Sequence, residues 1–422
     1  MEKDQTEITT KERGQAGPAP SYRTTLFACY VGYIAQAVNV NLFAVIFIPL
    51  RERFGLSYTQ FGTLVFANFL AQLTIDIALS RAVDRFGTRP FIKPALGFCA
   101  GGLLLFALTP TLLPDHIFAG FMASTLAFAA AGGLLELCLS PIVEAIPSDS
   151  ADSSKALSFL HSFYAWGQAG VVLITSALLF LGLPWQAIVA MWALIPAADL
   201  FLFARAPIAE RAHEGGALTI RKLLKNRLFL IAVVAIAFGG ASEAVVAQYA
   251  SSYLQKGLGL PKLAGDLFGV CGFAVCLGLG RLLYGMFGHR LDIHKVLTGG
   301  SALAFAAYLV VVFSPAGAPP VAAIALCGLF VSLLWPGTLA VAAQKLPLAG
   351  ASMFALLAAA GDLGCSIGPW AAGVATDFSM RFLPSGIGLN AEQFGLRAGL
   401  LVGALFPLAS FVAQLFFKNR QT

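Results

Sequence analysis

Five acidic residues stand in stretches of the sequence that are otherwise apolar: Asp76, Glu136, Asp199, Glu243 and Asp362. Glu136 is the clearest case, because it interrupts the run "STLAFAAAGGLLELCLSP". A carboxylate that has no fixed cation nearby, in surroundings that exclude water, tends to take up a proton or a small cation. Reversible binding of a proton or cation is therefore the chemistry that these residues can perform.

Each acid also has a structural interpretation. Glu136 can instead be a neutral acid that is hydrogen-bonded to a neighbouring helix. Glu243 follows Gly-Gly-Ala-Ser and Asp362 follows Ala-Ala-Ala-Gly, so both lie where helices can approach closely. Asp76 is near Arg81 and can brace a helix end. Both interpretations stay open for these four residues.

Basic residues are expected only near the ends of the apolar stretches. Arg81 and Arg281 are placed there, and no Lys or Arg is expected to reach the acids deeper inside. Asp199 is treated separately, because Arg205 follows it closely and predicts an ion pair at a helix end. The other four acids are thus expected to lack a cationic partner.

Uncharged polar side chains in the same stretches can hold a polar solute. Amide groups both donate and accept hydrogen bonds, and an aromatic ring offers an apolar platform with a polar edge. The tryptophans have packing as an equal alternative, and the histidine can serve as a hydrogen-bonding bridge between helices. The candidates are Gln36, Asn39, Asn41, His161, Trp166, Gln168, Gln248 and Trp335.

The elements that position these residues must be membrane-spanning helices. Of the 422 residues 58% are hydrophobic and 11% are charged, a composition outside the range of soluble domains. A helix needs about 20 apolar residues to cross a bilayer. The sequence therefore predicts an all-α integral membrane protein with twelve crossings, at residues 24–48, 59–80, 91–109, 117–146, 157–181, 185–204, 228–254, 264–287, 295–313, 320–343, 351–376 and 394–417.

The distribution of Lys and Arg predicts the orientation. If the chain starts on the cytoplasmic side, 21 of its 27 basic residues lie in the tails and the cytoplasmic loops. Both termini are therefore expected in the cytoplasm. The net charge of +6 is explained by this topology and by anionic lipid headgroups, so it does not indicate a nucleic-acid partner.

A long polar stretch, "ARAPIAERAHEGGALTIRKLLKNR", divides the chain into two halves. The expected organisation is a disordered tail at 1–20, six helices at 21–205, a cytoplasmic linker at 206–225 and six helices at 226–420. Prolines 141, 336 and 369 are expected to interrupt the fourth, tenth and eleventh helices. The seven cysteines all fall in apolar runs and are interpreted as packing residues.

The turn between the second and third crossings carries a recognisable pattern. The residues from Asp84 to Arg89, "DRFGTR", resemble the D-R-x-G-R-R loop signature of the major facilitator superfamily, although Ser80 replaces its leading glycine. The resemblance implies two pseudo-symmetric six-helix bundles. It also implies a gating role for this turn and its second-half counterpart, carried by Asp84, Arg85, Gly87, Arg89 and Arg281.

A looser resemblance is to the fucose permease branch of sugar and proton symporters. It is carried by "LLELCLSPIVE", "LSFLHSFYAWGQAG", "GGASEAVVAQYASSYL", "GLGRLLYG" and "WPGTLAVA". By this resemblance Glu136 matches a glutamate of helix 4 that handles solute and protons. Helix 1 departs from the pattern, because "IAQAVNVNLFAVIFIP" has no carboxylate. Coupling then needs another acid, such as Glu243, Asp362 or Asp76.

The sequence thus predicts a secondary active transporter of the inner membrane for a small polar, sugar-like solute, coupled to protons or to sodium. The alternatives are an exporter of drugs or metabolites that works by proton antiport, and a membrane sensor or scaffold that transports nothing. No enzyme motif, nucleotide-binding loop, cofactor site or metal cluster is recognised. The partners expected are the solute, the coupling ion and the lipid bilayer, and the protein is expected to be a monomer.

Overall fold

The computed structural model describes residues 22–146, 150–208, 223–346, 350–383 and 388–418. These residues form helices joined by short turns, which confirms the all-α prediction. The first half contains α2 (Arg23–Phe54), α3 (Tyr58–Phe86), α4 (Arg89–Leu112), α5 (Ile117–Glu144), α6 (Ser150–Phe180) and α7 (Trp185–Arg205).

The second half begins with α9 (Arg227–Ser252), which runs on into a π-helical turn, η2 (Tyr253–Gly257). The next crossing combines α10 (Lys262–Ala264), the π-helical η3 (Gly265–Cys271) and α11 (Gly272–Phe287). The remaining elements are α12 (Ile293–Phe313), α13 (Ala318–Val331), α14 (Leu334–Lys345), α15 (Gly350–Met380) and α16 (Ala391–Lys418).

The helices are long and apolar enough to cross a membrane. Within the described residues, eleven helical segments meet that test by length and composition, and α15 adds a further helix of 31 residues. Several helices extend beyond their apolar runs. In α2, for example, the helix continues past the expected limit to Phe54 and ends at Gly55, whose φ of 68° suits glycine. Long basic side chains let a helix continue into the headgroup region.

The expected helix breaks are only partly present. Pro141 lies inside α5 and Pro369 inside α15, and both helices continue through them, so these two predictions were wrong. A proline removes one backbone hydrogen bond, and packing on neighbouring helices can hold the helix together. The tenth crossing is interrupted between α13 and α14, just before Pro336.

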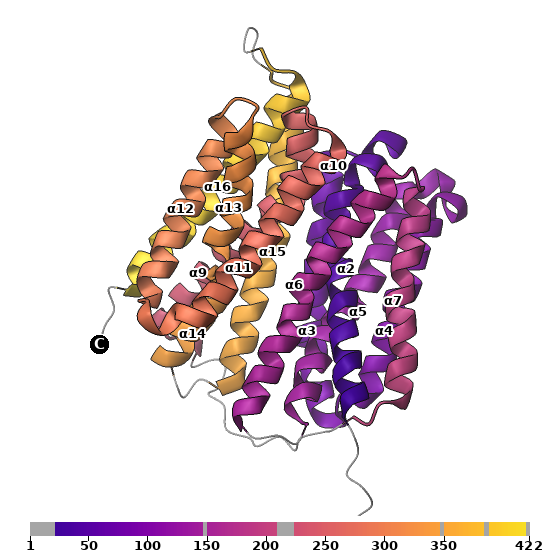
Figure 1. Cartoon of the computed structure of the whole chain (residues 1–422), viewed down its shortest axis with the longest axis vertical. Helices are drawn as coiled ribbons and strands as arrows, with labels where there is room; N and C mark the ends of the chain where they lie inside the picture. Colours follow the sequence, from indigo (N-terminus) through magenta and orange to yellow (C-terminus); the bar gives the residue numbers. More distant parts are fainter. Residues whose placement is uncertain (1–21, 147–149, 209–222, 347–349, 384–387, 419–422) are drawn as a thin grey trace, which may run out of the picture.

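The helices α2–α7 and the helices α9–α16 form two groups that lie side by side (Figure 1). We call α2–α7 the N-terminal group and α9–α16 the C-terminal group. The terminus face is the end of the molecule where α2 begins and α16 ends. The loop face is the opposite end, at the top of Figure 1, where α2 is joined to α3 and α15 to α16.

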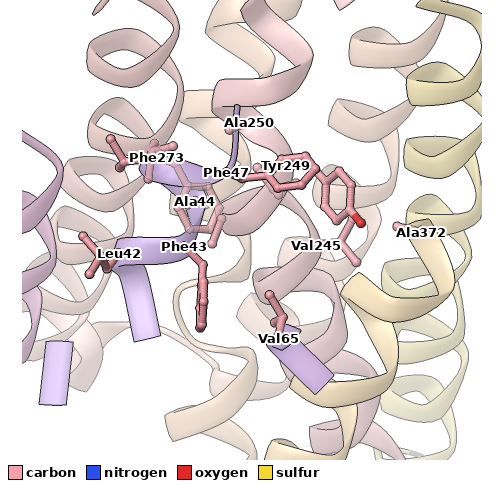
Figure 2. Close-up of a cluster of buried hydrophobic side chains, with 14 of the residues drawn as sticks. Leu42, Phe43, Ala44, Phe47, Val65, Val245, Tyr249, Ala250, Phe273 and Ala372 are labelled. Carbon is pink, nitrogen blue, oxygen red and sulfur yellow. The ribbon is translucent and has the colours of Figure 1, made fainter. Parts of the chain in front are cut away.

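The buried apolar side chains form two clusters, and the larger one contains residues of both groups. The larger apolar cluster includes residues of both groups, among them Phe43 and Phe47 of α2 and Tyr249 of α9 (Figure 2). A second buried cluster, which contains Cys29, Leu139 and other residues, is drawn from the N-terminal group alone. Apolar packing between the groups is thus concentrated in the larger cluster.

Glycines allow the helices of the two groups to touch. A Cβ atom added to Gly62 of α3 would lie 2.8 Å from the Cα of Trp370 in α15, and one added to Gly373 would lie 2.4 Å from the carbonyl oxygen of Tyr58. Real Cβ atoms do not approach other atoms so closely. The backbones of α3 and α15 are therefore in direct contact.

Candidate functional site

Three of the predicted acids come together between the two groups of helices. Asp76 of α3, Glu136 of α5 and Asp362 of α15 interact electrostatically with one another. Glu136 is exposed, Asp76 is half-buried and Asp362 is buried. Three carboxylates so placed repel one another when all are charged, which favours a state in which the cluster holds a proton or a cation. We call these three residues the carboxyl cluster.

The carboxyl cluster lies well inside the membrane-spanning part of the helices. Its residues stand eight to twelve positions from the helix ends at the terminus face. With a rise of about 1.5 Å per residue, this places them roughly 12 to 18 Å from those ends. A solute that bound near the cluster would contact both groups of helices.

Glu243 has a cationic partner, contrary to the prediction. Its Oε2 lies 3.4 Å from Nη2 of Arg281, whose Nε also donates to the carbonyl oxygen of Ser332 at 3.2 Å. Arg281 lies in α11 near the terminus face, and its long side chain reaches from there to α9. Both side chains remain partly exposed, at 36% for Arg281 and 24% for Glu243. The pair is therefore open to solvent.

Asp199 does not form the predicted ion pair with Arg205. Its side chain is completely buried in α7, and neither carboxyl oxygen has a hydrogen-bond partner among the described residues. A Cβ atom added to Gly32 would lie 3.3 Å from Oδ2 of Asp199, so the carboxyl group faces α2. Arg205 is exposed at the end of the helix. Asp199 and Arg205 therefore lie in different environments, although both belong to α7.

Two aromatic side chains, Tyr164 and Trp335, lie near the acids or next to them in the fold. Tyr164 of α6 interacts electrostatically with Glu136 and Glu243. Trp335 of α14 covers Gly361, the residue before Asp362: a Cβ atom on that glycine would lie 2.4 Å from the indole ring. The indole ring of Trp335 therefore packs against α15 at the residue before Asp362.

The amides of α2 are mostly engaged within the N-terminal group. Gln36 Nε2 donates to Gln72 Oε1 at 2.6 Å, and Gln72 Nε2 donates to Asn68 Oδ1 at 2.6 Å. Asn68 Nδ2 donates to the carbonyl oxygen of Asn39 at 2.7 Å, and Asn39 Nδ2 donates to the carbonyl oxygen of Phe128 at 3.2 Å. Asn39 Oδ1 accepts from the thiol of Cys99. We call these residues the amide network.

The amide network leaves few groups free for a solute. Asn39 is 1% exposed, and both the nitrogen and the oxygen of its amide already have partners within the N-terminal group. Gln36 keeps one buried oxygen, Oε1, without a partner. Asn41 donates to the carbonyl oxygen of Ala37 at 3.0 Å and lies 3.5 Å from the hydroxyl of Tyr164. Of the three, Asn41 is the one with a described contact to Tyr164.

The other predicted polar residues have different surroundings. Gln248 Nε2 donates to the carbonyl oxygen of Val40 at 3.2 Å, a contact between the two groups of helices. Gln168 is buried, whereas Trp166 is 72% exposed. The side chain of His161 lies outside the described residues.

The turn that follows α3 contains the proposed gating residues. Gly87 ends the helix with φ at 77°, a conformation that glycine adopts freely. Arg85 is exposed, and its guanidinium carbon lies 5.2 Å from the centroid of the Phe86 ring. Arg89 is exposed at the start of α4, and the side chain of Asp84 lies outside the described residues.

Sequence reasoning missed several residues near the site and at the loop face. Tyr33 interacts electrostatically with Glu136, and its hydroxyl lies 3.1 Å from the hydroxyl of Ser140. Asp377 and Glu392 of the C-terminal group contact the start of α3. Spacing along one helix could not reveal these contacts, because each joins residues more than a hundred positions apart in the sequence.

The family model of the Major Facilitator Superfamily matches residues 29–369. The chain therefore belongs to this superfamily of membrane transporters. A search of curated protein sequences gave no match.

Solved structures of transporters share the fold. A bacterial homologue of the human lysosomal transporter Spinster, in an inward-facing and occupied conformation, matches with a TM-score of 0.74 at 15% identity, over 96% of this chain and 98% of the other. A D-xylose–proton symporter matches with a TM-score of 0.70 at 16% identity, over 92% and 97%. The E. coli fucose:proton symporter matches with a TM-score of 0.62 at 18% identity, over 95% and 100%.

Proposed function

We propose that this transporter carries a small, polar, sugar-like solute across the inner membrane by alternating access, with protons as the coupling ion. The observation that supports this proposal best is the carboxyl cluster. It joins acids of α3 and α5 to an acid of α15, so it spans the boundary between the two groups of helices. A binding site at that boundary is reached from either side of the membrane when the groups rock against each other.

Glu136 is the member of the cluster that we assign to proton binding. Its side chain is exposed, whereas that of Asp362 is buried, so Glu136 is the more accessible of the two acids. The repulsion from Asp76 and Asp362 makes its charge depend on what else occupies the site. Proton binding and solute binding are then linked, and each changes the affinity for the other by the same factor.

The residues assigned to the solute are those that adjoin the acids. Asn41 and Tyr164 supply hydrogen-bonding groups on one side, and Trp335 supplies a ring on the other. Glu243 and Arg281 form a polar pair that remains open to solvent and can bind hydroxyl groups. The sugar-like character of the solute is inferred from this mixture of polar groups and one aromatic platform.

Uptake into proteoliposomes tests the proposal, with radiolabelled fucose and xylose as the first solutes. Glu136→Gln keeps nearly the same shape but cannot release a proton. We expect it to exchange solute across the membrane yet fail to accumulate solute when a pH gradient is imposed. Glu144→Gln is the matched control, because Glu144 is an exposed acid at the end of the same helix.

The possible outcomes test three parts of the proposal separately: the role of Glu136, proton coupling and the sugar-like solute. Accumulation by Glu136→Gln under a pH gradient would show that Glu136 is a structural acid. Accumulation driven by a sodium gradient and not by a pH gradient would contradict proton coupling. Failure of every monosaccharide in a wider panel to be taken up would contradict a sugar-like solute.

A further inference from the structure

At the loop face, the start of α3 is held by a carboxylate from the other group of helices. Asp377, near the end of α15, accepts hydrogen bonds from two backbone N–H groups of α3. Its Oδ1 lies 3.2 Å from the nitrogen of Tyr58, and its Oδ2 lies 2.6 Å from the nitrogen of Thr59. The first N–H groups of a helix lack partners within the helix and carry partial positive charge, so a carboxylate is a favourable partner.

The rest of the first turn is satisfied by the N-terminal group itself. Gln60 N donates to the hydroxyl oxygen of Ser57 at 3.1 Å, and Phe61 N donates to the carbonyl oxygen of Ser57 at 3.0 Å. Ser57 and Gln60 form a capping box. The N–H groups at the start of α3 are therefore satisfied by two sources: the cap residue Ser57 and the carboxylate of Asp377 in α15.

A second carboxylate of the C-terminal group binds the same region. Glu392 Oε1, at the start of α16, accepts from Arg51 Nε at 3.1 Å and from the hydroxyl of Tyr58 at 3.0 Å. The guanidinium carbon of Arg51 also lies 4.6 Å from the centroid of the Tyr58 ring. We call Arg51, Tyr58 and Thr59, together with Asp377 and Glu392, the loop-face latch.

Asp377 differs from Asp266, another acid at the loop face, in having no described hydrogen-bond partner within its own group of helices. Asp266, which accepts from Ser176 of the N-terminal group at 2.8 Å, also pairs with Lys262 of its own group. Asp266 would therefore keep a cationic partner if the two groups separated. In the described part of the chain, Asp377 accepts hydrogen bonds only from the two N–H groups of α3.

We propose that the loop-face latch holds the loop face closed, and that release of α3 by Asp377 is a required step in opening it. This inference rests on the proposed alternating-access function. When α3 and α15 separate, Tyr58 and Thr59 lose the carboxylate that satisfies their N–H groups. The closed state is favoured by the strength of these charge-assisted bonds.

Asp377→Asn tests the latch, because it keeps the size of the side chain and removes its charge. We expect the population with an open loop face to rise by about tenfold, the change that corresponds to losing a charge–helix contact. Asp115→Asn is the matched control. Asp115 is an exposed acid at the same face, in the turn between α4 and α5, and it has no described contact with the C-terminal group.

Spin labels at Leu181→Cys and Ala316→Cys report the opening, because these exposed residues lie at the loop face in different groups. Distances between the labels are measured by pulsed electron resonance on the full chain, without solute and at one pH. The native cysteines are mostly buried, and a sample without the two introduced cysteines gives the background. The measurement does not depend on which solute or ion is carried, so it can fail while the proposed function stands.

A larger share of long distances in Asp377→Asn than in Asp115→Asn would support the latch. Identical distributions in the two variants would overturn it. If Asp377→Asn does not fold, Glu392→Gln decides the question, because it removes the charge of the other carboxylate of the latch and leaves the backbone N–H groups of Tyr58 and Thr59 bonded to Asp377. An unchanged distribution in Glu392→Gln would then overturn the proposal.

Discussion

At the scale of single residues, the charged groups next to an acid decide whether it can bind and release a proton. Glu243 has Arg281 beside it, whereas Glu136 faces two other carboxyl groups. The sequence alone makes these two acids look equivalent, since each interrupts an apolar run. A fixed cation stabilises the charged form, and neighbouring acids destabilise it. The two residues therefore perform different chemistry.

The pair formed by Glu243 and Arg281 gives a first prediction at this scale. Arg281→Gln leaves an uncompensated carboxylate on α9, and Glu243→Gln leaves an uncompensated guanidinium on α11. We expect each variant to lower the melting temperature in detergent and the double variant to regain part of the loss. The coupling should be modest, about 1 kcal/mol, because both side chains are partly exposed. Additive losses would contradict direct pairing.

The amide network gives a second prediction. Gln72→Met removes the acceptor of Gln36 and the donor to Asn68 and leaves both groups buried. A stranded buried polar group costs about 1–3 kcal/mol, so the melting temperature should fall clearly. Leu70→Met on the same helix is the control, because Leu70 is 37% exposed and the change removes no hydrogen-bonding group. Equal stability of the two variants would mean that the network contributes little.

At the scale of helices, the sequence predicted the membrane crossings, which depend on composition. It did not predict the continuity of helices at prolines or the direction of side chains, which depend on packing. Twelve apolar runs gave the crossings, since the thickness of a bilayer sets the length of a helix. Pro141 and Pro369 were expected to break helices that the structure shows to be continuous. The isolation of Asp199 from Arg205 was also unpredictable, because the direction of a side chain depends on which neighbours surround the helix.

The contact between α9 and α15 gives a third prediction. A Cβ atom on Gly364 would lie 1.8 Å from the carbonyl oxygen of Ala237, so Gly364→Ala must push the two helices apart. Overpacking of this kind costs about 1–3 kcal/mol. Gly101→Ala is the control, because no atom lies within 4 Å of the added Cβ, and alanine favours a helix over glycine. A thermal unfolding series should show a loss only for Gly364→Ala.

At the scale of the whole molecule, the basic residues predict which face is cytoplasmic. The tails and the loops of the terminus face carry 21 of the 27 Lys and Arg residues. We therefore expect the terminus face in the cytoplasm and the loop face outside. A fluorescent reporter fused after Thr422 should be active, and alkaline phosphatase fused at the same position should be inactive. The reverse pattern would contradict this orientation.

The larger apolar cluster, which joins the two groups of helices, has a consequence for heat capacity. Opening the loop face would expose side chains such as Phe47 and Tyr249 to water. Hydration of apolar surface raises the heat capacity, so the enthalpy of opening must itself change with temperature. The ratio of open to closed molecules would then follow a curved van't Hoff plot. Cooling would weaken the apolar part of the closure, while the carboxylate contacts of the latch would respond to temperature in a different way.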